Sequence, residues 1–171
     1  MPSQLVNLFK SLTWPGYGNP RQLLAPQPGK PARAAFTDTR IGPYSWASDA
    51  VPGAKPARIR LRDDITITIE FWQTMSCVAS SVFQRPQQFQ DDLLAHEQVH
   101  YDIATLMARV LFIDLMTLKS KAYASNHAFT QDLEKVQLRY AGIQKIERRY
   151  DDETNHGLRA DPQRQWHGFI Q

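Results

Sequence analysis

The spacing of apolar residues changes along the chain and divides it into segments. In residues 58–82, apolar and polar residues alternate, and the apolar set is Ile59, Leu61, Ile65, Ile67, Ile69 and Phe71. A period of two with β-branched enrichment is typical of a half-buried strand. Asp63-Asp64 interrupts the alternation and predicts a turn that makes a hairpin of the two halves. Residues 72–82 can supply another short strand.

From Pro86 the apolar residues recur at steps of three and four, at Phe89, Leu93, Ile103, Met107, Val110 and Leu118. This pattern predicts a long helix to about Ala124. A second stripe follows the break at Ser125-Asn126, with Leu133, Val136, Tyr140, Ile143, Ile146 and Tyr150. It predicts one more helix, ending near Gly157. The short connection favours antiparallel packing of the two helices.

Residues 1–57 have a different composition, because nine of the 11 prolines lie in this part. Proline at this density excludes long helices. Interspersed aromatic residues argue against disorder, so we expect an ordered, irregular wrapper with short extended segments. The prediction is a single α+β domain over 1–171. It comprises the wrapper (1–57), a small antiparallel sheet (58–82), a helical part (86–157) and a C-terminal segment (158–171).

Composition narrows the possible functions. The net charge of +3 arises from 20 basic and 17 acidic residues, which is too small and too mixed to indicate nucleic-acid binding. A single cysteine, Cys77, excludes an internal disulfide framework and a cysteine-based zinc finger. No apolar run approaches the roughly 20 residues of a membrane span. The first residues do not read as a signal peptide, so a cytoplasmic location is the default expectation.

The long predicted helix contains the HExxH sequence His96-Glu97-Gln98-Val99-His100. Residues four apart are separated by about 1.1 helical turns, so both imidazoles project from one face and can share a metal ion. Zinc binds neutral imidazole readily, and catalytic zinc sites use three protein ligands and an open position. Glu97 projects beside this face, where it can accept a proton from a water.

The alternative is that His96 and His100 are ordinary core-facing residues of the helix. Burying two imidazoles and the Glu97 carboxylate without partners costs a few kcal/mol. A metal ion satisfies these groups together, which favours a metal site.

A third ligand must come from another part of the chain. The end of the second predicted helix is rich in possible ligands and reads YDDETNHG over residues 150–157. Antiparallel packing would bring this segment close to His96. On helical geometry, Glu153 and Thr154 continue the inward stripe, whereas His156 turns inward only if the helix frays before Gly157. Asp152, Glu153 and His156 therefore remain open as candidates.

The motifs together resemble a family of bacterial predicted zinc-dependent proteases, first catalogued as a domain of unknown function, in the HExxH metallopeptidase clan. The similarity rests on HEQVHYDI at 96–103, YDDETNHG at 150–157, Gln163 with Trp166, and Leu12-Thr13-Trp14 with Tyr17. Val99 replaces a glycine of the family pattern, and Tyr101 replaces its usual phenylalanine.

The resemblance implies a zincin-like fold with one Zn²⁺ per chain, held by His96, His100 and His156. Glu97 would be the general base, and Tyr150, Asp151 and Thr154 would support the site. Members of that family are mostly exported, which implies an exported or periplasmic location if a leader precedes this sequence.

These observations predict a zinc-dependent peptidase acting on a peptide or protein. Glu97 would remove a proton from the attacking water, and Tyr150 is the candidate oxyanion donor. The strand at 65–71 could bind an extended peptide if it lies at a sheet edge, or it is a plain core strand. Asp102 either orients a histidine or is merely solvated.

Two alternatives to the peptidase hypothesis remain. One is a metal-stabilised binding or scaffold module without catalysis, which would not need Glu97. The other is a basic nucleic-acid-binding domain, which the interleaved acidic residues disfavour.

Overall fold

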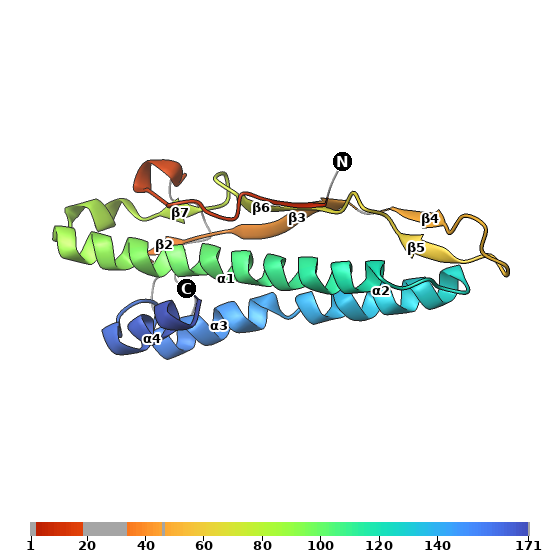
Figure 1. The fold of residues 1–171 in the computed structure, drawn as a ribbon. Helices are drawn as coiled ribbons and strands as arrows, with labels where there is room; N and C mark the ends of the chain where they lie inside the picture. Colours follow the sequence, from red (N-terminus) through yellow and green to blue (C-terminus); the bar gives the residue numbers. More distant parts are fainter. Residues whose placement is uncertain (1–2, 19–33, 46, 171) are drawn as a thin grey trace.

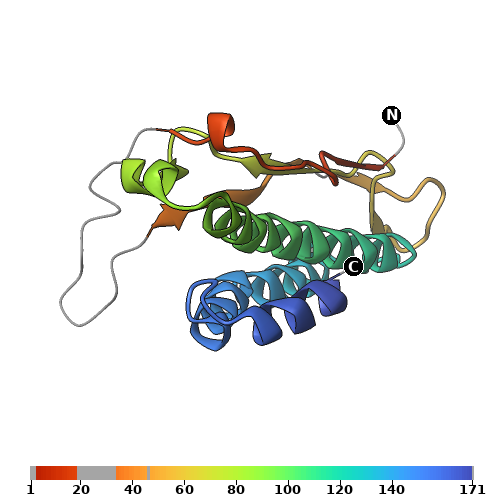
Figure 2. The same ribbon diagram turned by 90° about the vertical axis from the view of Figure 1, so that its left-hand side faces the viewer.

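The computed structural model describes residues 3–18, 34–45 and 47–170, with the side chains of 43–45 left aside. Small sheets in the N-terminal half lie along a set of long helices, so the expected α+β class is confirmed (Figure 1). Helix α1 runs between the strands on one side and the remaining helices on the other (Figure 2). Residues 19–33 of the predicted wrapper lie outside the described residues. The single-domain organisation stays a prediction.

The helices are α1 (Gln87–Lys119), α2 (Asn126–Tyr140), α3 (Ile143–Thr154) and α4 (Ala160–Ile170). The long predicted helix is confirmed, although it ends before Ala124. The second predicted helix is in fact two, because the chain turns at Ala141-Gly142 before α3 begins. Glycine at such a position weakens a continuous helix. Helices α2 and α3 run back along α1, which confirms the antiparallel arrangement (Figure 1).

The main sheet has the strand order β1-β6-β3 and comprises β1 (Gln4–Val6), β6 (Thr66–Phe71) and β3 (Thr39–Ser45). Strand β3 pairs antiparallel with β6, but β1 pairs parallel with it. The sheet is therefore mixed, and the expectation of a purely antiparallel sheet is wrong. The long connection between β1 and β6 permits a parallel pairing, which a tight turn cannot.

The predicted hairpin around Asp63-Asp64 is also wrong. Strand β5 (Ile59–Leu61) pairs with β4 (Ser48–Ala50), so the two halves of the pattern belong to different sheets. The backbone of Ile59 also exchanges two hydrogen bonds with Tyr123, at 2.9 and 2.7 Å, which holds β5 against the connection between α1 and α2. The alternation of apolar and polar residues predicted the two strands correctly, but it did not predict which strands they pair with.

Strand β6 is paired on both sides, so the idea that residues 65–71 form a free sheet edge is wrong. Among the described residues, β3 pairs only with β6 and is an edge strand. Two short strands, β2 (Ala35–Phe36) and β7 (Cys77–Val78), form a separate antiparallel pair, and β7 is the strand expected within 72–82. Short 3-10 helices cover Trp14–Gly16 and Ser80–Gln84.

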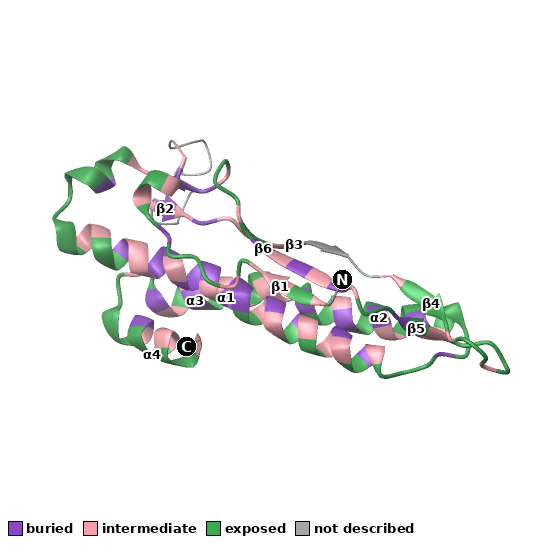
Figure 3. Ribbon diagram, turned by 45° about the horizontal axis from the view of Figure 1, so that its top comes forward, coloured by how far each residue is buried: buried purple, intermediate pink, exposed green. Residues whose placement is uncertain are grey.

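The main core lies where β6 meets α1. Ile65, Ile67 and Ile69 are fully buried and belong to one cluster with apolar α1 residues. The members from α1 are Leu93, Tyr101, Ala104, Ala108, Leu111, Leu115 and Leu118. Figure 3 shows buried residues running along both elements. None of the described helices is long and apolar enough to cross a membrane.

Candidate metal centre

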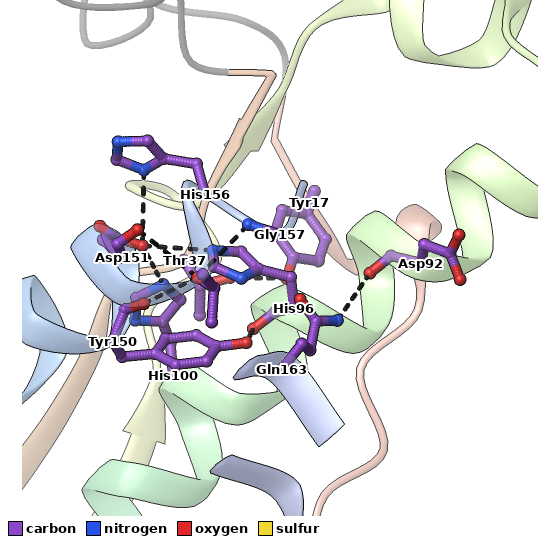
Figure 4. A network of polar contacts seen from close by, with 11 residues as sticks. Tyr17, Thr37, Asp92, His96, His100, Tyr150, Asp151, His156, Gly157 and Gln163 are labelled. Atoms are coloured by element: carbon purple, nitrogen blue, oxygen red, sulfur yellow. Dashed lines mark hydrogen bonds and ion pairs between the residues drawn. The ribbon is translucent and has the colours of Figure 1, made fainter. Parts of the chain in front are cut away.

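His96 and His100 lie one turn apart on α1 and are only 2% and 9% exposed. Asp151 of α3 faces both of them (Figure 4). Its Oδ1 atom is 3.2 Å from His96 Nε2 and 3.1 Å from His100 Nε2. The three ligand atoms lie within 4.8 Å of one another and form a group that could hold a metal ion.

Zinc is one metal ion that can be compared with this group. Bonds of about 2.0–2.2 Å at tetrahedral angles separate two ligand atoms by about 3.3–3.6 Å, close to the two distances at Asp151. Two imidazoles and a carboxylate are ligands that zinc accepts. Beside them, Glu97 is 3% exposed, and its Oε2 has no hydrogen-bond partner among the described residues. An unpartnered buried carboxylate oxygen is costly unless something donates to it.

The charges within the group are strongly coupled. Burial opposes the charged form of His100, but the hydrogen bond that His100 donates to Asp151 and the charges of Glu97 and Asp151 outweigh burial and raise the pKa of His100. Burial would raise the pKa of Asp151, but the two histidines outweigh it and hold that pKa well below its usual range. A metal must displace protons from imidazole ligands, so metal binding here competes with protonation of His100.

Tyr150 packs beneath the histidines. Its ring is stacked on His96 at 4.6 Å and meets His100 edge-on at 5.1 Å. The side chain is fully buried, and its hydroxyl donates to the backbone oxygen of His96 at 3.3 Å. Burial, followed by the charge of Glu97, raises the pKa of Tyr150. Because its hydroxyl is engaged with the backbone, the geometry gives no support to Tyr150 as an oxyanion donor.

The predicted ligand His156 lies at the rim of the group. Its Nδ1 is 3.5 Å from Asp151 Oδ1, and its side chain is 38% exposed. Asn155, His156 and Gly157 all have positive φ angles, of 49°, 53° and 83°. Such backbone is uncommon for non-glycine residues and clusters at functional sites. Ligation by His156 stays a prediction, whereas Asp151 occupies the position beside both histidines.

Gly157 allows this turn to approach α1. A Cβ atom at this position would lie 3.0 Å from both Cβ and Cγ of His96. Thr154 is fully buried and holds the turn from within, because its hydroxyl donates to the Tyr150 oxygen at 2.7 Å and accepts from Gly157 N at 3.4 Å. The segment that closes α3 therefore also buttresses the His96 ring.

The other candidate ligands of α3 face elsewhere. Asp152 is exposed. Glu153 pairs with Arg149 at 2.6 Å and accepts from Trp166 Nε1 at 2.8 Å, so it faces α4. Trp166 in turn packs edge-on against Tyr150 at 5.3 Å. The family resemblance implies only a supporting role for Asp151. The signal it overlooked is that Asp151 lies next to Tyr150 on the inward side of α3.

The opposite face of the HExxH segment holds the N-terminal segment. Gln98 accepts from Leu12 N at 2.8 Å and donates to the Lys10 oxygen at 3.0 Å. Gln98 also donates to Asp102 at 2.9 Å, and the Tyr101 hydroxyl donates to the Asn7 oxygen. The partner of Asp102 is thus Gln98, within the contact between α1 and the N-terminal segment. Of the two interpretations of Asp102, orientation of a histidine is not supported.

The metal group opens into a cleft of about 1120 Å³. The segment 34–41, which spans β2 and the start of β3, forms one wall, and α3 forms the other. His96, Glu97, His100 and Asp151 all line it. The charged residues that line the cleft include both signs. Asp38 and Arg40 lie on the strand side, and Glu147 and Arg148 lie on the helix side.

Fold and site together define an α+β protein with a possible buried metal centre of the HExxH type on its longest helix. Residues 20–157 match the family described as "Bacterial protein of unknown function (DUF922)", and the chain belongs to this family. The match includes the histidine pair and the 150–157 segment, whereas Leu12–Tyr17 and Gln163 with Trp166 lie outside it. Comparison with curated proteins gives no match, and comparison with solved structures gives none either.

Proposed function

We propose that this protein is a zinc-dependent peptidase. The observation that carries the proposal is Glu97, a buried carboxylate beside two imidazoles and a carboxylate that could hold a metal ion. Its Oε2 has no partner in the described ranges. A site that only held helices together would not need a buried base next to the ligands. A base of this kind is what hydrolysis requires.

His96, His100 and Asp151 would hold one zinc ion. When bound, zinc would polarise a carbonyl group and lower the pKa of water. His156 would act from the rim, either as a further ligand, as the family resemblance implies, or as a hydrogen-bond partner of Asp151. Tyr150 would keep both imidazoles in place through its ring contacts.

Glu97 would accept a proton from the attacking water and deliver it to the departing amine. Glu97 is 3% exposed and lines the cleft, so it can meet a water that enters from there. Within the part of the chain that the structure describes, no donor is bonded to Oε2, which leaves this oxygen able to receive the proton.

The cleft suits an extended peptide. Residues 39–41 at the start of β3 line it, and β3 is an edge strand among the described residues. A substrate segment could add to this edge through backbone hydrogen bonds, as in other cases of strand addition. The scissile bond would then lie between β3 and the metal group.

Zinc analysis of purified protein, followed by variants, tests the proposal. We expect about one zinc per chain, as for a single three-ligand site. Asp151→Ala should reduce zinc affinity by more than the 10–100-fold typical of supporting residues. Asp152→Ala, an exposed carboxylate next in the chain, is the matched control and should have no effect.

His156→Ala distinguishes the two sets of ligands. If His156 is a ligand, as the family resemblance implies, His156→Ala should lose as much zinc affinity as Asp151→Ala. If His156 only contacts Asp151 from the rim of the site, the loss of zinc affinity should be smaller. Glu97→Gln should keep zinc but lower the rate of peptide hydrolysis by at least about 100-fold. Absence of zinc after reconstitution would refute the proposal, and retention of full activity by Glu97→Gln would refute the mechanism.

A further inference from the structure

Residues 12–17 form a motif that the proposed function leaves unexplained. Trp14–Gly16 form a short 3-10 helix, and the backbone N–H of Tyr17 donates to the Trp14 oxygen at 2.9 Å. The Tyr17 ring packs against Trp14 at 5.1 Å and against Phe71 at 5.2 Å. These contacts hold a phenol in a fixed place although it lies in a short irregular segment.

The Tyr17 hydroxyl meets the hydroxyl of Thr37 at 2.7 Å. Both side chains are buried, at 8% and 7% exposure. Thr37 lines the cleft together with Glu97 and the histidine pair, whereas Tyr17 lies behind it. Figure 4 draws both hydroxyl residues beside the metal group.

The number of protons in this pair of hydroxyls suggests a role for it. Two hydroxyl groups carry two protons, and the single hydrogen bond between them uses one. Either hydroxyl can be the donor in this pair. Burial and then the charge of Glu97 raise the pKa of Tyr17, and they outweigh the hydrogen bond with Thr37, which lowers it, so the phenol keeps its proton. When Tyr17 donates to Thr37, the Thr37 proton has no acceptor within the pair and is available to a group bound in the cleft that Thr37 lines.

We propose that Thr37, backed by Tyr17, donates a hydrogen bond to the carbonyl oxygen of the bound peptide and stabilises the negative charge that this oxygen gains when water adds to the carbon. The proposal rests on the proposed peptidase function. Thr37 would be a catalytic residue, because it touches the reacting oxygen, and Tyr17 a positioning residue. This assignment replaces Tyr150, whose hydroxyl is bonded to the His96 backbone.

The test compares Thr37→Val, Thr37→Ser and Tyr17→Phe in the zinc-loaded protein. Thr37→Val should lower kcat by about 10²–10³-fold, as for loss of one oxyanion donor, with little change in KM. Thr37→Ser should restore most of the rate, and Tyr17→Phe should cause a smaller loss. Thr105→Val and Tyr123→Phe are matched controls, because both residues are buried but lie outside the cleft.

A second readout does not depend on turnover. An N-phosphoryl dipeptide presents a tetrahedral oxyanion, so calorimetry should find its affinity reduced in Thr37→Val in proportion to kcat, while a plain N-acyl dipeptide binds unchanged. If the wild type hydrolyses peptides and Thr37→Val matches it, the donor is wrong and the peptidase stands. If no peptide is hydrolysed but phosphoryl affinity still depends on Thr37 and Tyr17, the donor stands and the peptidase fails. Failure of the wild type to bind the phosphoryl dipeptide would overturn the donor.

Discussion

The two halves of α1 differ in the polar side chains that they bury. The distal, C-terminal half places Leu111, Leu115 and Leu118 in the main core, and its surface residue Asp114 pairs with Arg139 of α2 at 2.8 Å. The proximal half buries His96, Glu97 and His100, and leaves His96 Nδ1 and Glu97 Oε2 without partners among the described residues. Both halves contribute apolar residues to the core, but the proximal half also holds polar groups ready for a ligand at some cost in stability.

Phe129→Ala at the distal end has the largest expected effect on stability. Phe129 is 7% exposed and packs edge-on against Tyr123 at 5.4 Å. Removing its ring should lower the free energy of unfolding by about 3–5 kcal/mol, as for other buried phenylalanines. Denaturant unfolding of the metal-free protein measures this loss. If the two halves of α1 act independently, the folded variant should bind zinc with unchanged affinity. A parallel loss of zinc would mean that the two halves are coupled.

Gly157→Ala should have the next largest effect, and Gly53→Ala is its matched control. Both glycines have positive φ, of 83° and 71°, but nothing lies within 4 Å of a Cβ at Gly53, whereas His96 atoms lie 3.0 Å from one at Gly157. The backbone conformation alone should cost each variant about 1–2 kcal/mol. Only Gly157→Ala should lose more stability than this. It should also bind zinc more weakly, because the added methyl group would displace the ring of His96. Equal effects of the two variants on unfolding and on zinc would contradict the close approach.

Local patterns predicted the elements that the local sequence controls. Steps of three and four placed α1, and alternation placed β5 and β6, because both patterns report which side of an element is buried. The HExxH spacing predicted the histidine pair for the same reason, since residues four apart share a helix face. These predictions needed no knowledge of distant parts of the chain.

Features that depend on distant partners were missed. Strand β5 pairs with β4 and not with β6, and its position is set by Tyr123 from the connection that follows α1. The break at Gly142 lets α3 present Asp151 to the histidines, which a continuous helical stripe does not predict. The partner of Thr37 lies 20 residues away in an irregular segment. No periodicity carries this information.

Glu97→Leu tests the cost of the proximal half directly. In the metal-free protein, at a pH high enough to deprotonate His100, whose pKa is raised, this change removes a buried carboxylate with an oxygen that has no partner among the described residues. The free energy of unfolding of the metal-free protein should rise by about 0.5–2 kcal/mol, the range of common stabilising substitutions. Glu97→Gln, which keeps a polar group there, is the control and should gain less. A loss of stability in Glu97→Leu would mean that the carboxylate supports the fold rather than burdening it.

Asp132→Asn at the distal end has the smallest expected effect. Asp132 pairs with Lys121 at 2.9 Å and Lys135 at 3.1 Å, and hydrogen bonds from these lysines lower its pKa from 3.8 to about 2. A lowered folded-state pKa stabilises the protein above pH 3.8, and that contribution is lost as the pH falls through about 2. Both ion pairs of Asp132 lie near the surface, where ion pairs contribute little to stability and are screened by salt. Wild type and variant should therefore differ slightly in denaturant unfolding at neutral pH and low salt, and the difference should vanish both near pH 2 and at about 1 M salt. A difference that persists at low pH would show that Asp132 acts through packing or uncharged hydrogen bonds. In that case the region around the C-terminal end of α1 would also depend on a specific polar contact, like the region around His96 and Glu97.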